Sequence, residues 1–226
     1  MVLIDTTLTT NLIATAYRFE TFRTNCKNFL NKHDLSFDKF TVVRHDSFVG
    51  YITEYLLRDY IATTYASHGL VIDTWENKFD IKRIMNIIHI ASNDAQDIQY
   101  VRSYFYDQYD LKISRGDVNI TIDIKSALTK LEPKSSWNFM YPAVQAQKCG
   151  KDYIILVYYI VENLQNIESL KKLAVIGYTS QDIIKKCPVV KSGTLTRFGT
   201  KSQIDNYETE LAFHYKNIDE LISVFL

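Results

Sequence analysis

Apolar residues recur at helical spacing through most of the first half of the chain. This spacing predicts helices at four places: residues 1–45 (after a short start), 46–67, 82–90 and from about residue 92 to residue 107. Asp46 and Ser47 are candidate caps of the second helix, and Gly69 stands just beyond its expected end. The N-terminal part is therefore predicted to be mainly helical, with residues 1–45 as a packing or dimerisation layer.

The pattern changes at residues 109–126, where apolar and polar residues alternate as they do in β-strands. Two alternating runs flank Gly116 and Asp117, a pair suited to a tight turn, so this segment is predicted to be a β-hairpin. With these two residues as the loop, Leu111 faces Ile122 and the apolar positions of both strands lie on one side. A slip of one residue would turn them to the other face, so the pattern fixes the register.

The rest of the chain alternates between predicted strands and helices. Residues 153–161 form a continuous apolar run without alternation, which is typical of a central strand buried on both faces. The other expected elements are strands at residues 70–75 and 173–178, and helices at residues 137–148, just after Ser180 and at residues 217–225. These elements predict an α/β (α+β) fold, with a central mixed β-sheet flanked by helices and an N-terminal helical extension.

Composition agrees with one folded domain. Of the 226 residues, 46% are hydrophobic and 13% are aromatic, with only 7 Gly and 3 Pro, which argues against disorder. Lys+Arg and Asp+Glu both number 26, and this zero net charge disfavours a passive nucleic-acid coat protein, which is usually basic. It weighs less against an enzyme whose basic residues are confined to one cleft.

Cysteine usage and hydropathy predict a cytoplasmic protein without a membrane segment. The cysteines, Cys26, Cys149 and Cys187, lack metal-site spacing and are interpreted as reduced thiols. The N-terminus shows no basic stretch followed by an apolar core, so no signal peptide is expected. The longest apolar run, residues 153–161, is far too short to span a bilayer.

The polar face of the predicted hairpin carries two carboxylates that should repel each other. In the register above, Asp110 falls opposite Asp123 at a Cβ separation of about 5 Å, and Lys125 lies two residues further along the same face. A cation between the carboxylates would remove the repulsion, and Mg²⁺ usually takes one or two carboxylates together with water and phosphate. A lysine there could position or deprotonate the attacking water, or stabilise charge on a phosphate. The pattern indicates metal-assisted phosphodiester hydrolysis.

Asp110, followed by a turn and Asp123-Ile124-Lys125, resembles the motif of the PD-(D/E)xK nucleases, the superfamily that holds most type II restriction endonucleases. The resemblance implies that Asp110 and Asp123 bind catalytic Mg²⁺ and that Lys125 serves the nucleophilic water. One departure is Tyr109, which stands where the family motif has proline. The order of predicted elements over residues 48–185 also resembles the α/β core of that fold.

The resemblance implies a restriction-endonuclease-like core and an enzyme that cleaves double-stranded DNA. We expect a Mg²⁺-dependent, sequence-specific type II restriction endonuclease of a restriction-modification system, acting as a homodimer on symmetric sites. The single nuclease domain would comprise a helical extension (1–45), a PD-(D/E)xK-like core (46–185) and a C-terminal segment for DNA contact or dimerisation (186–226). Alternatives are a resolvase or repair nuclease of the same fold, and a non-catalytic α/β interaction protein whose acidic hairpin face is merely solvated.

Other residues are candidates for the same site. Glu54 occupies the helix position where the family often carries an active-site glutamate, and the alternative is a surface glutamate. Asp107 competes with Asp110 for the metal, but the hairpin register favours Asp110. Gln145 and Gln147 could assist the site, because the family's next helix often supplies a polar residue, although solvation is the simpler interpretation.

A basic segment that contains glycine lies between residues 185 and 201. Lys191, Arg197 and Lys201 are the predicted DNA-contact residues, because loops of this kind can reach phosphates or base edges. The alternative interpretation is a solvated surface loop.

Overall fold

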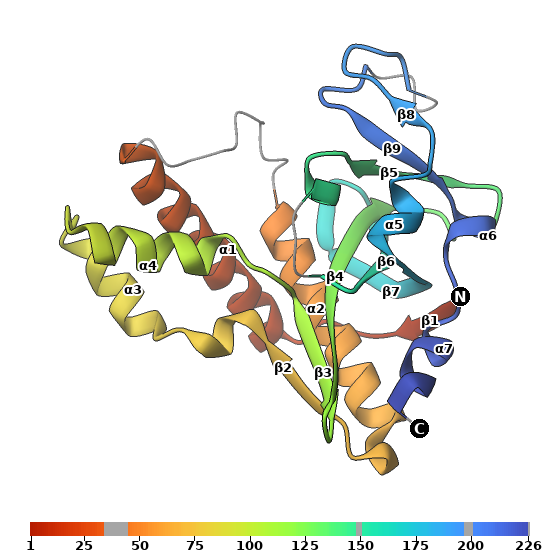
Figure 1. The fold of residues 1–226 in the computed structure, drawn as a ribbon, viewed down its shortest axis with the longest axis horizontal. Coiled ribbons are helices and arrows are strands. Elements are labelled where there is room, and N and C mark those ends of the chain that lie inside the picture. Colours follow the sequence, from red (N-terminus) through yellow and green to blue (C-terminus); the bar gives the residue numbers. More distant parts are fainter. Residues whose placement is uncertain (34–44, 148–150, 197–200, 226) are drawn as a thin grey trace.

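The computed structural model describes residues 1–33, 45–147, 151–196 and 201–225. A six-stranded sheet lies at its centre, with strand order β1-β7-β6-β4-β3-β2 (Figure 1). The strands are β1 (Val2–Asp5), β2 (Val71–Thr74), β3 (Leu111–Arg115), β4 (Val118–Thr129), β6 (Tyr153–Asn163) and β7 (Asn166–Thr179). Strands β4 and β6 pair in parallel, and the other neighbouring strands of this sheet pair antiparallel. The prediction of a mixed sheet flanked by helices is confirmed.

The predicted hairpin forms with the predicted register. Gly116 has a φ of +55° in the two-residue turn, a conformation that glycine adopts at little cost. Leu111 pairs with Ile122, and Arg115 pairs with Val118 beside the turn. The apolar side chains of β3 and β4 therefore face the same core.

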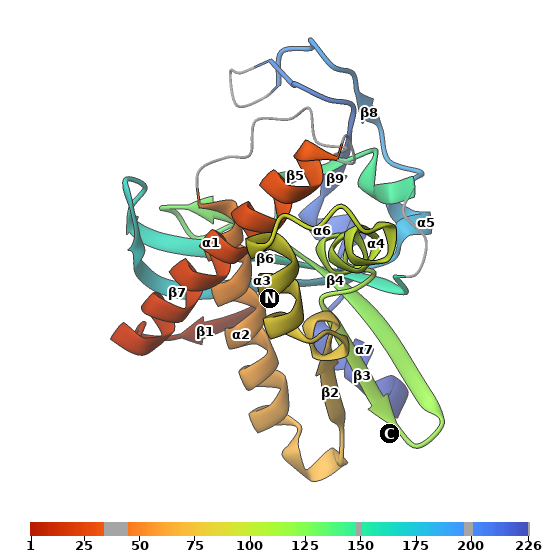
Figure 2. The same ribbon diagram turned by 90° about the vertical axis from the view of Figure 1, so that its left-hand side faces the viewer.

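Helix α2 (Asp46–Thr64) covers one face of this sheet, as Figure 2 shows. Its buried residues, among them Phe48 and Ile52, pack in one core with side chains of β3, β4, β6 and β7. The helix ends at Thr64, a few residues before the predicted end, and the short helix η1 (Ala66–His68) follows it. Gly69, with a φ of +63°, then ends η1.

The predicted caps of α2 are wrong. Asp46 and Ser47 lie inside the helix, and His45 takes the N-cap position with a left-handed backbone and no side-chain cap hydrogen bond. Asp46 still lies in the first turn, where a negative charge stabilises the helix dipole.

A second helical layer consists of α1 (Thr10–Lys32), α3 (Ile81–His89) and α4 (Ala95–Phe105), which lie together at the left of Figure 1. These helices share a core of their own, formed by Cys26, Phe29, Leu30, Ile84, Ile87, Val101 and Tyr104. The side chains of Asp80 and Asp94 cap α3 and α4. The N-terminal extension is helical as predicted, but its short start is strand β1, and the predicted helical residues 34–44 lie outside the described ranges.

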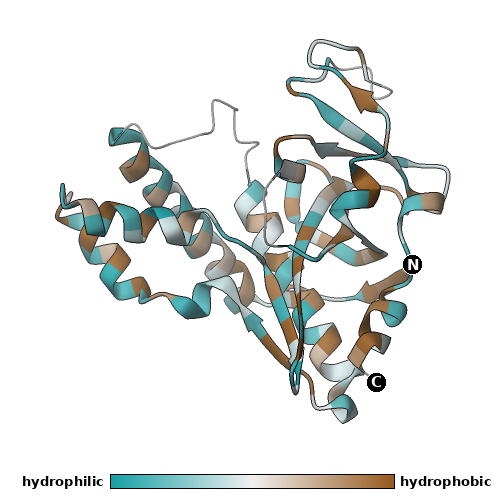
Figure 3. Ribbon diagram, in the orientation of Figure 1, coloured by the Kyte–Doolittle hydropathy of each residue, from teal (hydrophilic) through white to brown (hydrophobic). Residues whose placement is uncertain are grey.

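Strand β6 is the buried central strand that the sequence predicted. Residues 154–161 are all buried, with β4 on one side and β7 on the other. Figure 3 shows hydrophobic residues, in brown, recurring along the hairpin and the strands beside it. The strand predicted at residues 173–178 is longer than expected, because β7 pairs with β6 on one side and with β1 on the other.

The helix predicted at residues 137–148 is wrong. The structure has strand β5 (Asn138–Pro142) and the short helix η3 (Gln145–Gln147) there, while Lys148 lies outside the described ranges. Phe139 and Tyr141 alternate with their neighbours as strand residues do, and β5 pairs along its length with β9 (Asn206–Glu210). With β8 (Val189–Val190), these strands form a second, three-stranded sheet.

The short helix predicted after Ser180 is present, and the predicted last helix is shorter than expected. Ser180 caps α5 (Gln181–Ile184), and the helix expected at residues 217–225 consists of α7 (Ile218–Ile222) followed by η4 (Ser223–Phe225). Helix α6 (Leu211–His214) lies between α5 and α7 in the sequence. Within the described ranges, no helix has both the length and the apolar character needed to cross a membrane.

Candidate active site

The hairpin brings Asp110 and Asp123 together. Asp110 directly precedes β3, and its backbone N–H donates to the carbonyl oxygen of Ile122 at 2.8 Å. This bond is one residue out of step with the β3–β4 register, in which Leu111 pairs with Ile122, so the regular pairing ends at Leu111. Asp110 still lies close enough to Asp123 for the Asp123 charge to raise its pKa. Asp110 is only 8% exposed and Asp123 only 1%. Two carboxylates are therefore held out of water in one small region of the sheet.

The Asp110 carboxyl group is attached to β4 and resists ionisation. One of its oxygens accepts a hydrogen bond from the backbone N–H of Ile124. Burial, and then the negative charges of Asp123 and Asp107, raise the pKa of Asp110 to about 7. A cation beside Asp110 would offset both causes, so the ionised form of this site favours cation binding.

The Asp123 carboxylate has two ammonium partners. Lys125 Nζ lies 2.7 Å from one of its oxygens, and Lys151 forms a second ion pair with the other. The Tyr141 hydroxyl donates a hydrogen bond to Asp123 at 3.4 Å. Burial acts to raise the pKa of Asp123, but the two ammonium groups outweigh burial and lower it. Asp123 is therefore ionised at neutral pH.

Lys125 brings a permanent positive charge to the site. It projects from β4 on the same face as Asp123, and its side chain is mostly buried. Burial acts to lower the pKa of Lys125, but the charges of Asp123 and Asp110 outweigh burial and raise it. Because an ammonium group that keeps its proton cannot take one from water, Lys125 is suited to stabilising and positioning a phosphate.

Helix α2 places Glu54 in the same electrostatic environment. Burial, and then the charges of Asp110 and Glu76, raise the pKa of Glu54 well above its usual value. This placement favours the interpretation of Glu54 as a site residue over that of a solvated surface glutamate.

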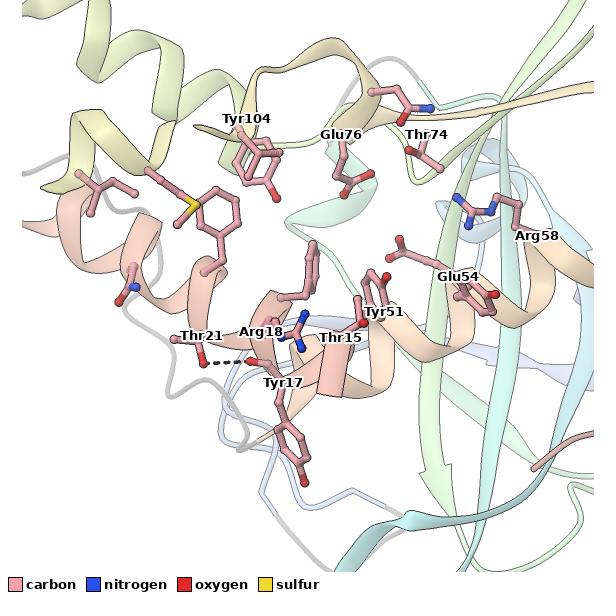
Figure 4. Close-up of a pocket in the computed structure, with 18 of the residues that line it drawn as sticks. Thr15, Tyr17, Arg18, Thr21, Tyr51, Glu54, Arg58, Thr74, Glu76 and Tyr104 are labelled. Atoms are coloured by element: carbon pink, nitrogen blue, oxygen red, sulfur yellow. Dashed lines mark hydrogen bonds between the residues drawn. The ribbon is translucent and has the colours of Figure 1, made fainter. Parts of the chain in front are cut away.

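A cleft of about 980 Å³ borders Glu54 and is lined by residues of α1, α2, α3, α4 and the short helix η2 (Trp75–Lys78). Figure 4 shows the side chains of Glu54 and Glu76 extending into this cleft from facing walls, with Arg58 beside Glu54. Burial is the main cause that raises the pKa of Glu76. The cleft is within the size range of ligand pockets, and its aromatic walls include Tyr51 and Tyr104.

Three residues of this region were missed by the sequence analysis. Lys151 lies two residues before β6, and the one available signal was a basic residue shortly before the run predicted to be a buried central strand. Glu76 and Tyr141 had no such signal. Glu76 lies in the short helix η2 after β2. Tyr141 was predicted to lie in a helix, but the structure has strand β5 there.

The remaining candidates for the site were Asp107, Gln145 and Gln147. Asp107 lies near the site, since its charge contributes to the raised pKa values of Asp110, Glu54 and Glu76. Gln145 lies on η3, and its buried Oε1 has no hydrogen-bond partner among the described residues. The side chain of Gln147 is not among those that the structure describes.

Of the predicted DNA-contact residues, Lys191 and Lys201 lie near the second sheet and apart from the two carboxylates. Lys191 is exposed, and its Nζ forms an ion pair with Asp205 at 2.8 Å. Lys201 is exposed and forms an isolated β-bridge with Leu195. Arg197 lies outside the described ranges. The structure does not bring Lys191 or Lys201 together with Asp110 and Asp123.

The donor atoms of the site suit a hard cation. In the part of the chain that the structure describes, no three His, Cys, Asp or Glu side chains gather closely enough to hold a metal ion by themselves. Mg²⁺ does not require such a cage, because it keeps several waters and binds through one or two carboxylates and the phosphates of its substrate. Asp110 and Asp123 meet that requirement.

Comparisons with known proteins found no match among protein-family models, curated proteins or solved structures. Function is therefore inferred from the geometry and electrostatics of Asp110, Asp123, Lys125 and Glu54.

Proposed function

We propose that this chain is a Mg²⁺-dependent endonuclease of the PD-(D/E)xK type that hydrolyses phosphodiester bonds in double-stranded DNA. One observation carries the proposal: Asp123 and Lys125 form an ion pair on β4, Asp110 lies beside them just before β3, and Glu54 of α2 lies near Asp110. The order of elements supports it, because α2 precedes the antiparallel strands β2, β3 and β4, and the chain then crosses over to β6, parallel to β4. The proposal includes a restriction-endonuclease-like fold and a type II restriction enzyme acting as a homodimer.

Asp110 and Asp123 would hold the Mg²⁺, with Glu54 as a further oxygen donor. When bound, Mg²⁺ polarises the phosphate and lowers the pKa of a water molecule. The burial of both aspartates excludes bulk water, which strengthens the attraction between these carboxylates and a cation.

The chain's own groups supply the remaining chemistry. Lys125 keeps its proton and stabilises the negative charge that develops on the scissile phosphate. Glu54, when ionised, is suited to accept the proton of the attacking water, because burial and the neighbouring carboxylates raise its pKa and so make it a stronger base than an ordinary glutamate. Asp123 positions Lys125, because its carboxylate forms a 2.7 Å ion pair with the ammonium group.

Incubation of the purified protein with plasmid and phage DNA in Mg²⁺ tests the proposal. Discrete fragments should appear with the natural protein and disappear when a chelator is added. Asp123→Asn should abolish cleavage, and Asp117→Asn should retain it. Asp117 is a matched control, because it is an exposed residue in the turn of the same hairpin. The proposal is wrong if no DNA is cut, or if Asp123→Asn cuts as fast as the natural protein.

A non-catalytic interaction protein is the competing function, and one observation favours it. Lys125 and Lys151 already neutralise Asp123, as they would in a purely structural ion-pair network. In that case the protein would bind no Mg²⁺ at millimolar concentration, and calorimetric titration with Mg²⁺ in the absence of DNA distinguishes the two functions.

A further inference from the structure

Asp123 has one more positive partner than its charge requires. Its carboxylate carries one negative charge, and the ammonium groups of Lys125 and Lys151 both contact it. All three side chains are buried to a large extent: Asp123 is 1% exposed, Lys151 is 5% exposed and Lys125 is 21% exposed. A buried cation in excess is costly unless another group neutralises it.

The two lysines reach Asp123 from different segments of the chain. Lys125 lies on β4, two residues beyond Asp123, so its position follows from the strand itself. Lys151 comes from the segment before β6, and its neighbour Asp152 fixes that segment to β4. The Asp152 backbone N–H donates to the Thr121 carbonyl oxygen at 3.0 Å, and the Asp152 carboxylate accepts a hydrogen bond from the Thr121 N–H at 2.8 Å. The backbone of Lys151 is thus anchored, while its four-carbon stem allows the ammonium group to take other positions.

A count of charges shows why a divalent cation would disturb this arrangement. With Asp110 ionised, the two aspartates and the two lysines sum to zero. A divalent cation at the aspartates would add two positive charges to these four buried groups, of which an ionised Glu54 would offset one, and it would compete with Lys151 for the Asp123 oxygen that Lys151 contacts. One ammonium group must then move, and a substrate phosphate would supply the missing negative charge.

We propose that Lys151 is an internal counter-ion of Asp123, that it leaves Asp123 when a divalent cation binds, and that it then contacts the DNA phosphate beside the site. This inference rests on the proposed function. Lysine is suited to the second role, because its ammonium group binds phosphate as a point charge. Lys151 is therefore a positioning residue in the free protein and a phosphate-binding residue in the complex.

Titration with Mg²⁺ in the absence of DNA tests the first step without any measurement of cleavage. Lys151→Met removes the competing charge and should bind Mg²⁺ about tenfold more tightly or better, by isothermal calorimetry. Lys151→Arg keeps the charge and should bind Mg²⁺ like the natural protein. The control is Lys172→Met, which removes a lysine of β7 that forms a 2.7 Å ion pair with Glu132 and, within the described part of the chain, no ion pair with either aspartate. It should leave Mg²⁺ binding unchanged.

The outcomes separate this inference from the proposed function. Equal Mg²⁺ affinity in Lys151→Met and the natural protein, or weaker affinity in the variant, overturns the inference and leaves the proposed function standing. If neither protein binds Mg²⁺, both are wrong. Circular dichroism establishes that each variant is folded, and if Lys151→Met does not fold, Lys151→Gln provides the same test with a polar side chain.

DNA binding tests the second step. The salt dependence is measured with the cleavable DNA in Ca²⁺, which carboxylates also bind, after a gel has established that the DNA stays intact. Loss of one phosphate contact should reduce the salt slope of Lys151→Met by about one unit in Ca²⁺ but not in chelator. An identical slope in both proteins with Ca²⁺ overturns the phosphate contact.

Discussion

Replacing Asp110 with asparagine should make the metal-free protein more stable while it abolishes catalysis. Asp110 is buried, lies close to Asp123 and has its pKa raised from 3.8 to about 7. Because the carboxyl group binds its proton more tightly in the folded chain than in the unfolded chain, the folded state loses stability as the pH rises from about 4 through 7. Asparagine keeps the shape and the hydrogen-bond acceptor for Ile124 without the charge.

The size of the effect follows from the pKa. The difference between 3.8 and about 7, at about 1.4 kcal/mol per pH unit, corresponds to about 4 kcal/mol of destabilisation above pH 7. Asparagine also places an amide NH₂ group in the buried site where the carboxyl group had an oxygen, and burying that donor offsets about 1–2 kcal/mol. We therefore expect Asp110→Asn to raise the free energy of unfolding by about 2 kcal/mol at pH ~8, and by less at pH ~5, where the natural carboxyl group is protonated in the folded state.

Urea denaturation in a chelator, at both pH values, measures this difference. Asp117→Asn serves as the control, because it makes the same substitution at an exposed position of the same hairpin and should show no such pH dependence. Addition of Mg²⁺ should then stabilise the natural protein but not Asp110→Asn. A variant that is less stable than the natural protein at pH ~8, or a gain that does not change with pH, would refute the electrostatic account of this site.

Three further predictions concern activity and DNA binding. Asp123→Asn should abolish cleavage yet leave DNA binding intact or tighter in a filter or mobility-shift assay, because it removes a negative charge near the phosphate; full activity would exclude Asp123 from the site. Lys125→Met should remain folded and bind DNA, with single-turnover cleavage reduced by about 10² or more; a rate within about threefold of the natural protein would contradict its role. Neutralising Lys191 or Lys201 should weaken DNA binding and lower the salt slope by about one unit, and unchanged slopes in both variants would place the DNA surface elsewhere.

Elements whose partners are close in sequence were predictable, and those with distant partners were not. The hairpin register follows from residues 109–126 alone, and it brings Asp110 close to Asp123 before any tertiary contact is known. Strand β5 pairs with β9, and β1 pairs with β7, so their strand character depends on residues far along the chain. The same reason explains why Lys151 escaped notice. Its role comes from an ion pair with Asp123 across 28 positions, and no local pattern records such a contact.

The parallel pairing of β4 with β6 has a consequence for the order in which the site forms during folding. The β3–β4 hairpin closes a loop of two residues, whereas contact between Asp123 and Lys151 requires the chain to close a loop across 28 positions. Closing the longer loop costs more conformational entropy, and strand pairing between distant segments is slow. The two carboxylates are therefore expected to meet first, when little but solvent separates their charges. The Lys151 ammonium group reaches the two aspartates only when β6 docks. The aspartates are therefore buried, and their negative charge is partly neutralised, in the same folding step.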